Sequence, residues 1–330
     1  MRSYQASSLD VTKVKILSVL RERKGLLYFI TDWLVILSCS LICEHFFSWP
    51  LYLITALIIA SRQHALLVLV HDAAHYRITS SKTMNDLTAN FFAGFPCFIG
   101  THSYRLHHLQ HHQHLNTELD PDWARKIHQP EWQFPMPKRM LARILFQQVL
   151  IGGYEWVVLT STMLLKNLHL SAKDPRKKEG LLLATYFMAM FGLAIYFNLF
   201  HQLIFYWLIP LLTLFPLIQR IRSISEHFAV DRDRILNRTR NISTTWIERF
   251  FFSPHSVNWH LVHHLYPSVP HYNLEELHQQ LMTDQQYAKN QHLNHSYFLP
   301  VRGSVLKDLI STKQREKNYS NNSTENSRSA

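Results

Sequence analysis

Cysteine is scarce in this chain of 330 residues, which has only three: Cys39, Cys43 and Cys97. Three cysteines are too few for a disulfide framework, and because they lie in or beside apolar runs we expect them to pack as thiols. The sequence also lacks a C-x-x-C-H haem motif, the cysteine set of an iron–sulfur protein and a G-x-G-x-x-G dinucleotide fingerprint. No recognised site for an electron-carrying prosthetic group is therefore present in the sequence.

Acidic residues are also in the minority, since 23 Asp and Glu against 34 Lys and Arg give a formal net charge of +11 at pH 7. No recognised nucleic-acid motif or aromatic-basic repeat accompanies this charge, so we expect no nucleic-acid partner. Hydrophobic residues make up 47% of the chain, and long apolar runs alternate with segments rich in Arg, Lys and His. This pattern indicates an integral membrane protein with basic loops beside the bilayer.

Four apolar runs are each about long enough to cross a bilayer, which takes roughly 20 residues of helix. They are residues 26–47, 49–70, 181–200 and 203–219. Two further runs, 87–100 and 144–165, are predicted to lie along or partly in the interface. A crossing by residues 144–165 would place the basic loop 166–180 on the outer face, against the positive-inside tendency.

The predicted fold is all-α, with four transmembrane helices in two hairpins, interfacial helices and a histidine-rich cytoplasmic cap. Residues 1–25 are predicted to form a basic amphipathic segment on the membrane surface, although an ordinary solvated helix fits as well. Residues 26–305 form a single membrane domain, and the polar residues 306–330 are predicted to be a disordered tail. Both termini and every histidine cluster lie on the cytoplasmic side in this topology.

Histidine spacing carries the chemical signal. HDAAH places His71 and His75 one helical turn apart, at the predicted end of the second span. HLQHH and HLVHH repeat an i, i+3, i+4 spacing, which puts three imidazoles on one helix face. The residues of these two clusters are His108, His111 and His112, and His260, His263 and His264. Three such clusters on one predicted membrane face indicate metal binding rather than surface or core histidines.

Eight imidazoles exceed what one metal ion takes, so the sequence predicts two metals. Iron, zinc and copper all accept imidazole, and ligand type leaves the choice among them open. His227 in RSISEHF is a ninth candidate ligand, because it follows the last predicted span. In the second cluster His107 is an alternative to His108, since it gives the pattern HxxxHH.

Acidic and amide side chains beside the clusters are predicted to hold the ligating rings, because such histidines usually donate their second N–H to a carboxylate or carbonyl. The candidates are Asp72, Asp120, Glu226 and Asn258. For Asp120, which precedes Pro121, helix capping or turn formation is an equally simple interpretation.

The clusters and their surroundings resemble the three histidine boxes of the membrane fatty acid desaturase superfamily, its bacterial members in particular. The segments that carry the resemblance are RQHALLVLVHDAAHY, YRLHHLQHHQHLNTELDPDW and NWHLVHHLYPSVPHYNLEELH. The resemblance covers residues 50 to 285. It implies two iron ions held by the eight box histidines, with His227 as the extra histidine of some members. Ser223 stands where some acyl desaturases have Asn, so no tenth side-chain ligand is expected there.

The resemblance implies an enzyme that uses O2 to attack an unactivated C–H bond of an apolar lipid or acyl substrate. Desaturation is the leading hypothesis, and a lipid or carotenoid hydroxylase or ketolase with the same iron site is the nearest alternative. A histidine-rich metal transporter is disfavoured, because the clusters flank the spans instead of lying along a path through them. The electrons must come from a separate ferredoxin-, cytochrome- or reductase-type donor, which the basic loops could dock.

Overall fold

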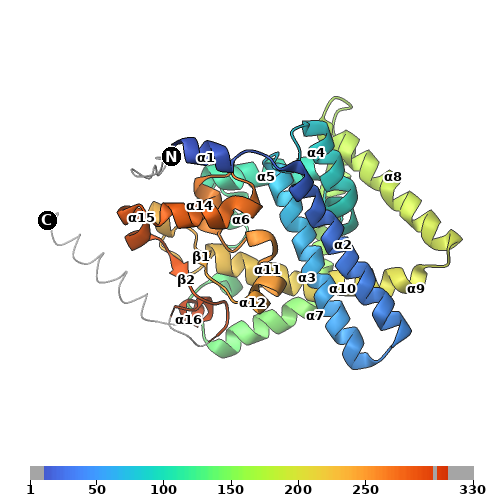
Figure 1. Cartoon of the computed structure of the whole chain (residues 1–330). Coiled ribbons are helices and arrows are strands. Elements are labelled where there is room, and N and C mark those ends of the chain that lie inside the picture. The colour runs from blue at the N-terminus through green and yellow to red at the C-terminus, as the bar shows by residue number, and fades with distance from the viewer. Residues whose placement is uncertain (1–10, 300–302, 311–330) are drawn as a thin grey trace.

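The computed structural model describes residues 11–299 and 303–310, and this part of the chain is almost entirely helical (Figure 1). Up to residue 168 the elements are α1 Val11–Leu17, α2 Glu22–His45, α3 Trp49–Ala74, α4 Lys82–Ala89, η1 Asn90–Gly94, η2 Phe95–Cys97, α5 Thr101–His114, α6 Pro121–Ala124, η3 Pro130–Trp132 and α7 Lys138–Leu168. The rest are α8 Pro175–Tyr196, α9 Phe200–Leu203, η4 Ile204–Leu208, α10 Ile209–Leu212, α11 Leu214–His227, η5 Ile235–Asn237, β1 Asn241–Ile242, α12 Trp246–Phe252, η6 Pro254–Ser256, α13 His260–Leu265, η7 His271–Asn273, α14 Leu274–Leu281, α15 Gln285–Asn290, β2 Leu293–Asn294 and α16 Val305–Ile310. Of the predicted tail 306–330, residues 306–310 belong to α16, and the rest lies outside the described residues.

Five helices in the described part of the chain are long and apolar enough to cross a membrane. They are α2, α3, α7, α8 and the interrupted helix Phe200–His227, which contains α9, η4, α10 and α11. The helical membrane architecture is thus confirmed, but the apolar helices number five where the sequence predicted four spans. The additional helix is α7, which contains the run 144–165 assigned to the interface.

Sequence signals account for where α3 and α8 begin. Pro50 and Pro175 lie in the first turn of these helices, where a missing N–H costs no hydrogen bond. Asp174 caps α8 by accepting a hydrogen bond from the Arg176 amide at 2.9 Å. Only three residues, 46–48, separate α2 from α3, so the two helices form the first predicted hairpin (Figure 1).

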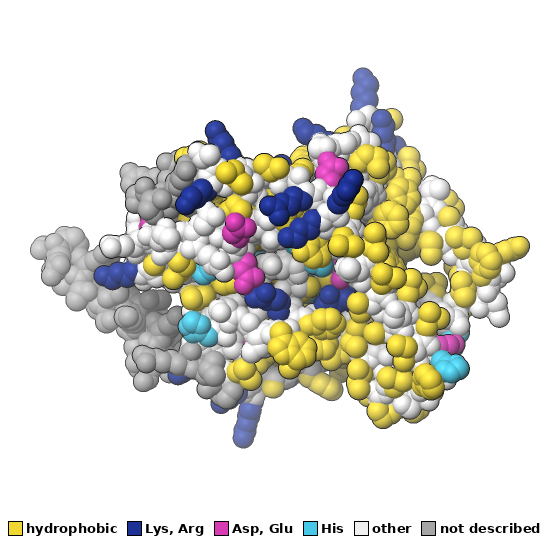
Figure 2. Space-filling model, in the orientation of Figure 1, with side chains coloured by type: hydrophobic (Ala, Val, Ile, Leu, Met, Phe, Trp, Pro, Cys, Tyr) yellow, Lys and Arg dark blue, Asp and Glu magenta, His cyan; other side chains and the backbone are white. Residues whose placement is uncertain are grey.

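Helix α3 is the centre of the membrane part. In its most apolar stretch 78% of the residues are buried, compared with 17–33% in the other four long helices. It packs against α2, α5 and α11. The outer helices expose large apolar side chains, such as Leu34 of α2 and Met188 of α8, and Figure 2 shows apolar surface gathered at the end where these helices lie. Exposed apolar surface of this extent indicates contact with lipid.

Short elements between residues 228 and 310 form a cap over one end of the long helices. Strands β1 and β2 pair in parallel inside it. One apolar cluster of the cap includes Trp259, Leu277 and Leu17 of α1, and Asn273 donates a hydrogen bond to the Leu17 carbonyl at 2.7 Å. The apolar side of α1 that we predicted to face the membrane therefore packs in part against the cap.

Glu179 of α8 closes the amino end of α5, the helix that carries the second histidine cluster. Its carboxylate accepts hydrogen bonds from the backbone amides of His102 and Ser103 at 2.6 and 2.9 Å, and from the Ser103 hydroxyl at 2.8 Å. A Cβ atom at Gly100 would lie 2.2 Å from the Glu179 carboxylate, so a larger residue there would have to displace this side chain from the end of α5. A negative charge at this end satisfies free amides and complements the helix dipole.

We expect Glu179→Ala to lower the free energy of unfolding by about 1–3 kcal/mol, because buried donors at the start of α5 lose their acceptor. Thermal unfolding in detergent measures the change. Glu44→Ala is the matched control, since Glu44 is an exposed carboxylate that contacts Gln202 at 3.2 Å. Equal melting temperatures for the two variants would contradict the capping role.

Candidate metal centre

Four helices bring the predicted histidines together. His71 lies in the last turn of α3, and His75 is the residue that ends this helix. The second cluster lies in α5, which packs against α3, and His227 is the last residue of α11. The third cluster lies in α13, which is part of the cap. Its Leu261 amide donates a 3.2 Å hydrogen bond to the carbonyl of Arg240, the residue before β1.

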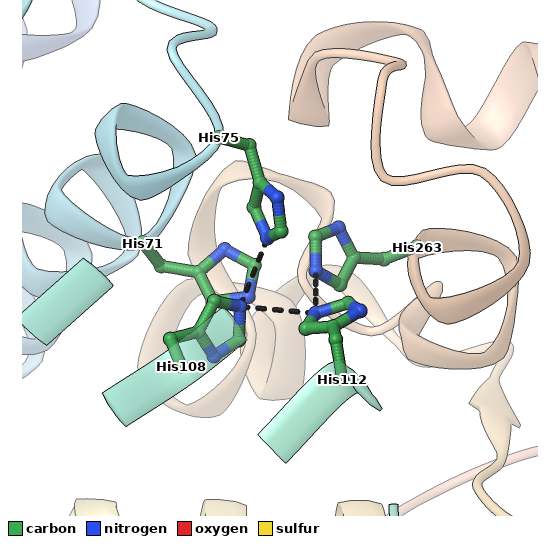
Figure 3. A group of neighbouring side chains, drawn as sticks. All are labelled: His71, His75, His108, His112 and His263. Carbon is green, nitrogen blue, oxygen red and sulfur yellow. Dashed lines mark hydrogen bonds between the residues drawn. The ribbon is translucent and has the colours of Figure 1, made fainter. Parts of the chain in front are cut away.

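The histidines form two groups in which one potential ligand atom from each side chain lies within 4.8 Å of every other. The first group contains His71, His75, His108, His112 and His263 (Figure 3). The second group contains His111, His227, His260 and His264. The groups are adjacent, since the rings of His112 and His264 stack with their centroids 4.2 Å apart. All nine candidate ligands therefore lie in two neighbouring clusters, as a two-metal site requires.

Ring nitrogens within each group point toward one another at metal-site spacing. In the first group Nε2 of His108 lies 3.0 Å from Nε2 of both His75 and His112 (Figure 3). In the second, Nε2 of His260 lies 2.9 Å from that of His227 and 3.1 Å from that of His264. Neighbouring ligands at right angles, each about 2.1 Å from a metal, have nitrogens about 3.0 Å apart. The rings thus fit a metal ion in each group.

Burial favours the neutral form of several of these rings, which is the form that metal ligation requires. Burial, with a contribution from His71, lowers the pKa of His75 to about 3. Burial and neighbouring imidazoles hold the pKa values of His108, His260 and His263 well below their usual range. In His71 the buried Nε2 has no hydrogen-bond partner among the described residues, which suits a ligand atom.

Two of the predicted supporting carboxylates lie beside histidines of the two groups, and Asp120 is within hydrogen-bond distance of one. Both oxygens of Asp120 lie 3.0 Å from Nδ1 of His111, which leaves the other nitrogen of this ring for the second group. Asp120 also caps α6 through the Asp122 amide at 2.9 Å, so both roles considered for it are realised. Asp72 lies 3.7 Å from Nδ1 of His71 and 2.7 Å from Nδ1 of His271.

The other two predicted supporting residues behave differently. Glu226 lies 3.5 Å from Nε2 of His260 and 4.0 Å from Nε2 of His227, on the side where these rings face their group. It also accepts a 2.8 Å hydrogen bond from Arg222. Asn258 instead donates to the Ile242 carbonyl at 2.8 Å, so its side chain holds β1 rather than a ligand ring.

The side chains of His107 and His108 lie in different places. His108 lies in the first group, whereas Nε2 of His107 lies 3.2 Å from the Arg125 guanidinium and outside both groups. Helical geometry explains the difference, because His107 lies about 100° around α5 from its neighbour.

Contacts beyond the motifs also support the site. His271 donates both its amide and its Nδ1–H to Asp72, at 3.0 and 2.7 Å. Arg105 ties α5 to the end of α3 through the carbonyls of Ala73 and Ala74, both at 2.9 Å, and pairs with Asp86. Sequence reasoning missed both residues. For His271, proximity to the third cluster was the available signal, but its partner lies 199 positions away.

A cavity of about 760 Å³ adjoins the histidine groups between α5, α7, α11 and the segment around α6 and η3. His108, His111, His227 and His260 form part of its wall. Opposite them α7 contributes Ile151, Trp156 and Leu159. A substrate in this cavity would contact both metal groups.

Comparison with known proteins agrees with this geometry. The model of the fatty acid desaturase family matches residues 47–297, and the chain belongs to this family. The resemblance inferred from the histidine boxes is thereby confirmed, and the protein is an oxidoreductase of the desaturase type. Such an enzyme implies a lipid substrate, O2 and an electron donor.

Its relatives are bacterial and plant desaturases. Dihydrorhizobitoxine desaturase of Bradyrhizobium elkanii is 28% identical over 305 residues, which is 87% of this chain and 84% of the relative. The sn-1 acyl-lipid omega-3 desaturase (ferredoxin) of Nostoc sp. (strain 36) is 26% identical over 280 residues, 76% of this chain and 73% of the relative. The sn-1 oleoyl-lipid 12-desaturase of Synechocystis sp. is 27% identical over 231 residues, 64% and 62% of the two chains.

Proposed function

We propose that the protein is a diiron, O2-dependent membrane desaturase that converts a CH2–CH2 unit of its substrate into a cis or trans CH=CH unit. In the balanced reaction the substrate loses two hydrogen atoms, that is two protons and two electrons, while a donor supplies two electrons and the solvent two protons. O2 accepts all four electrons and leaves as two water molecules. The observation that carries this proposal is the pair of adjacent all-histidine groups beside one cavity.

The nine histidines are proposed to bind two iron ions, five rings at one ion and four at the other. An iron pair supplies the redox chemistry that activates O2 for attack on an unactivated C–H bond, which redox-inactive zinc does not provide. The protein's own part is to keep the rings neutral and oriented. Asp120 orients His111, and Glu226 is close enough to the second group to serve as an additional oxygen ligand.

Four crossings are proposed for the membrane arrangement, with α7 along the interface. Both ends of α7 contact the side of the molecule that carries the histidines. Just before it, the Met136 amide donates to the Leu309 carbonyl of α16 at 2.9 Å. Near its end, Asn167 donates to the Ser103 hydroxyl of α5 at 2.8 Å. With α7 along the interface, the pair α2 and α3 and the pair formed by α8 and the helix Phe200–His227 each begin and end on this side of the membrane. We propose that this side is cytoplasmic, because its loops are basic.

The electron donor is proposed to be a separate acidic protein of the ferredoxin type. The name of the Nostoc relative includes ferredoxin, and Lys and Arg side chains outnumber acidic ones on the face shown in Figure 2. Electrostatic docking of this kind weakens with salt. Turnover with a reduced ferredoxin should therefore fall steeply as the ionic strength rises.

Mass spectrometry of the lipids and soluble metabolites of a host that expresses the protein tests the reaction. His263→Ala, expressed to an equal level, is the control, because His263 belongs to the first group. A product that lacks two hydrogens and is absent from the control supports desaturation. A product that gains oxygen would assign the protein to the hydroxylases or ketolases. Identical extracts together with iron-free protein would contradict the proposal.

A further inference from the structure

Part of the wall of the cavity beside the metal groups is charged, in addition to the apolar side chains that α7 contributes. Lys126, Arg220 and Arg222 line it together with Asp122 and Glu226. Burying a methylene chain against these groups would remove their water without replacing its hydrogen bonds, which is unfavourable. The wall suits a substrate that brings polar groups of its own close to the reacting carbons.

Two cations of this wall lie around the same aromatic ring. The Lys126 ammonium lies 4.7 Å from the centre of the Trp132 ring, and the Arg220 guanidinium lies 3.3 Å from it. Arg220 donates a hydrogen bond to the backbone carbonyl of Glu131 at 2.6 Å, so this contact does not neutralise its charge. Arg222, by contrast, is paired with Glu226. Arg125 and Arg143 also line the cavity, and Lys126 forms a long ion pair with Asp122 at 3.8 Å. Lys126 and Arg220 are thus two of the cations that an anion in the cavity would meet, and they share one aromatic ring.

Lys126 is also close to the second metal group. Its ammonium donates to the Ser223 hydroxyl at 2.9 Å, and Ser223 lies one helical turn before His227 in α11. The nearest carboxylate oxygen to Lys126 belongs to Asp122, 3.8 Å away, which is too long for a hydrogen bond. An anionic group at Lys126 would thus lie beside the last turn of α11, which ends at the proposed ligand His227.

We infer that this cavity binds the anionic end of the substrate, a carboxylate or a phosphate, at Lys126 and Arg220, next to the metal groups. The inference rests on the desaturase function proposed above and specifies its substrate class. The bond that is dehydrogenated then lies a few carbons from the charge and not in the middle of a long acyl chain. The anion can belong to a lipid or to a compact water-soluble molecule.

Binding to the purified, iron-loaded protein tests the anion site independently of turnover. Hexanoate and hexanamide are the probes, since they are similar in size and differ in charge. The wild type should prefer hexanoate, and Lys126→Gln should weaken hexanoate binding roughly tenfold to a hundredfold while hexanamide binding stays unchanged. Lys126→Arg should restore the preference. Arg249→Gln, which removes an exposed cation paired with Glu275 at 3.2 Å, is the control and should bind like wild type. Equal binding of both probes by wild type and Lys126→Gln overturns the inference.

The position of the new double bond tests the second half of the inference. Host extracts are separated into lipid and aqueous fractions, and products lacking two hydrogens are cleaved at the double bond for mass spectrometry. A double bond within a few carbons of a carboxylate or phosphate supports the inference, and the fraction that contains it identifies the source of the anion. A double bond farther along an acyl chain overturns the inference but retains the desaturase. Absence of any such product, compared with His263→Ala, contradicts the desaturase function itself.

Discussion

His264→Ala is expected to remove about one of the two bound iron ions and to lower turnover by more than about 100-fold. Loss of a residue that only supports a metal ligand costs up to about 100-fold, so loss of a ligand itself should cost more. His264 belongs to the smaller group, whose four rings become three. In that group its Nε2 lies 3.1 Å from Nε2 of His260, so the substitution removes one corner of the proposed site. Iron analysis of the purified protein, together with product formation, measures both effects.

His112→Ala and His107→Ala complete the test. His112 belongs to the five-ring group, which would still hold four rings, so we expect a smaller loss of iron than for His264→Ala. His107 lies on the same helix but outside both groups, and its removal should leave the iron content unchanged. Retention of two iron ions by His264→Ala, or loss of iron from His107→Ala, would contradict the assignment.

The grouping of the candidate ligands could be anticipated in part from the sequence, because it depends on local helix geometry. Spacings of three and four residues place side chains on one face wherever a helix forms, and α5 and α13 do form over the two HxxHH clusters. His227 was predictable for a different reason, since the end of an apolar run marks where a span emerges beside the site. The division into groups of five and four depends on how α3, α5, α11 and α13 pack, which local spacing does not encode.

Long-range contacts explain what the sequence did not reveal. His271 contacts Asp72 across 199 positions, and Glu179 contacts the start of α5 across 76 or more. Neither residue lies in a periodic pattern, so only the folded chain identifies its role. Asn258 shows how nearness in sequence differs from contact, because it lies two residues before the third cluster and its amide donates to the Ile242 carbonyl of β1.

The membrane topology shows the limit of hydropathy. Helix α7 satisfies the length and composition of a spanning helix as well as α8 does. Hydropathy indicates only that a helix is apolar enough to lie in lipid. Whether the helix crosses the membrane or lies along the interface depends on its contacts with the rest of the protein. At Gly153 a Cβ atom would lie 2.2 Å from the Leu212 carbonyl, so α7 and α10 approach backbone to backbone. Glycine here permits the close packing that is common between membrane helices.

Asp120→Asn is expected to lower iron affinity or turnover by about 10- to 100-fold, although the substitution preserves the shape of the side chain. Both carboxylate oxygens of Asp120 lie 3.0 Å from Nδ1 of His111, and the side chain is buried. An amide in its place puts an N–H group or a weaker, neutral acceptor opposite this ring. His111 then loses the charged partner that fixes its orientation and keeps its Nδ1 protonated. Iron titration and product formation are the measurements.

Asp174→Asn is the matched control, because Asp174 also caps a helix and is also followed by proline. Each substitution weakens a cap and should cost at most about 1 kcal/mol of stability, since Asn is also a good capping residue. Only Asp120→Asn also alters the partner of a proposed ligand. If Asp120→Asn and Asp174→Asn lowered stability equally and neither changed the iron affinity, Asp120 would be a capping residue alone, and the orientation of His111 would depend on packing against the rings of His227 and His264.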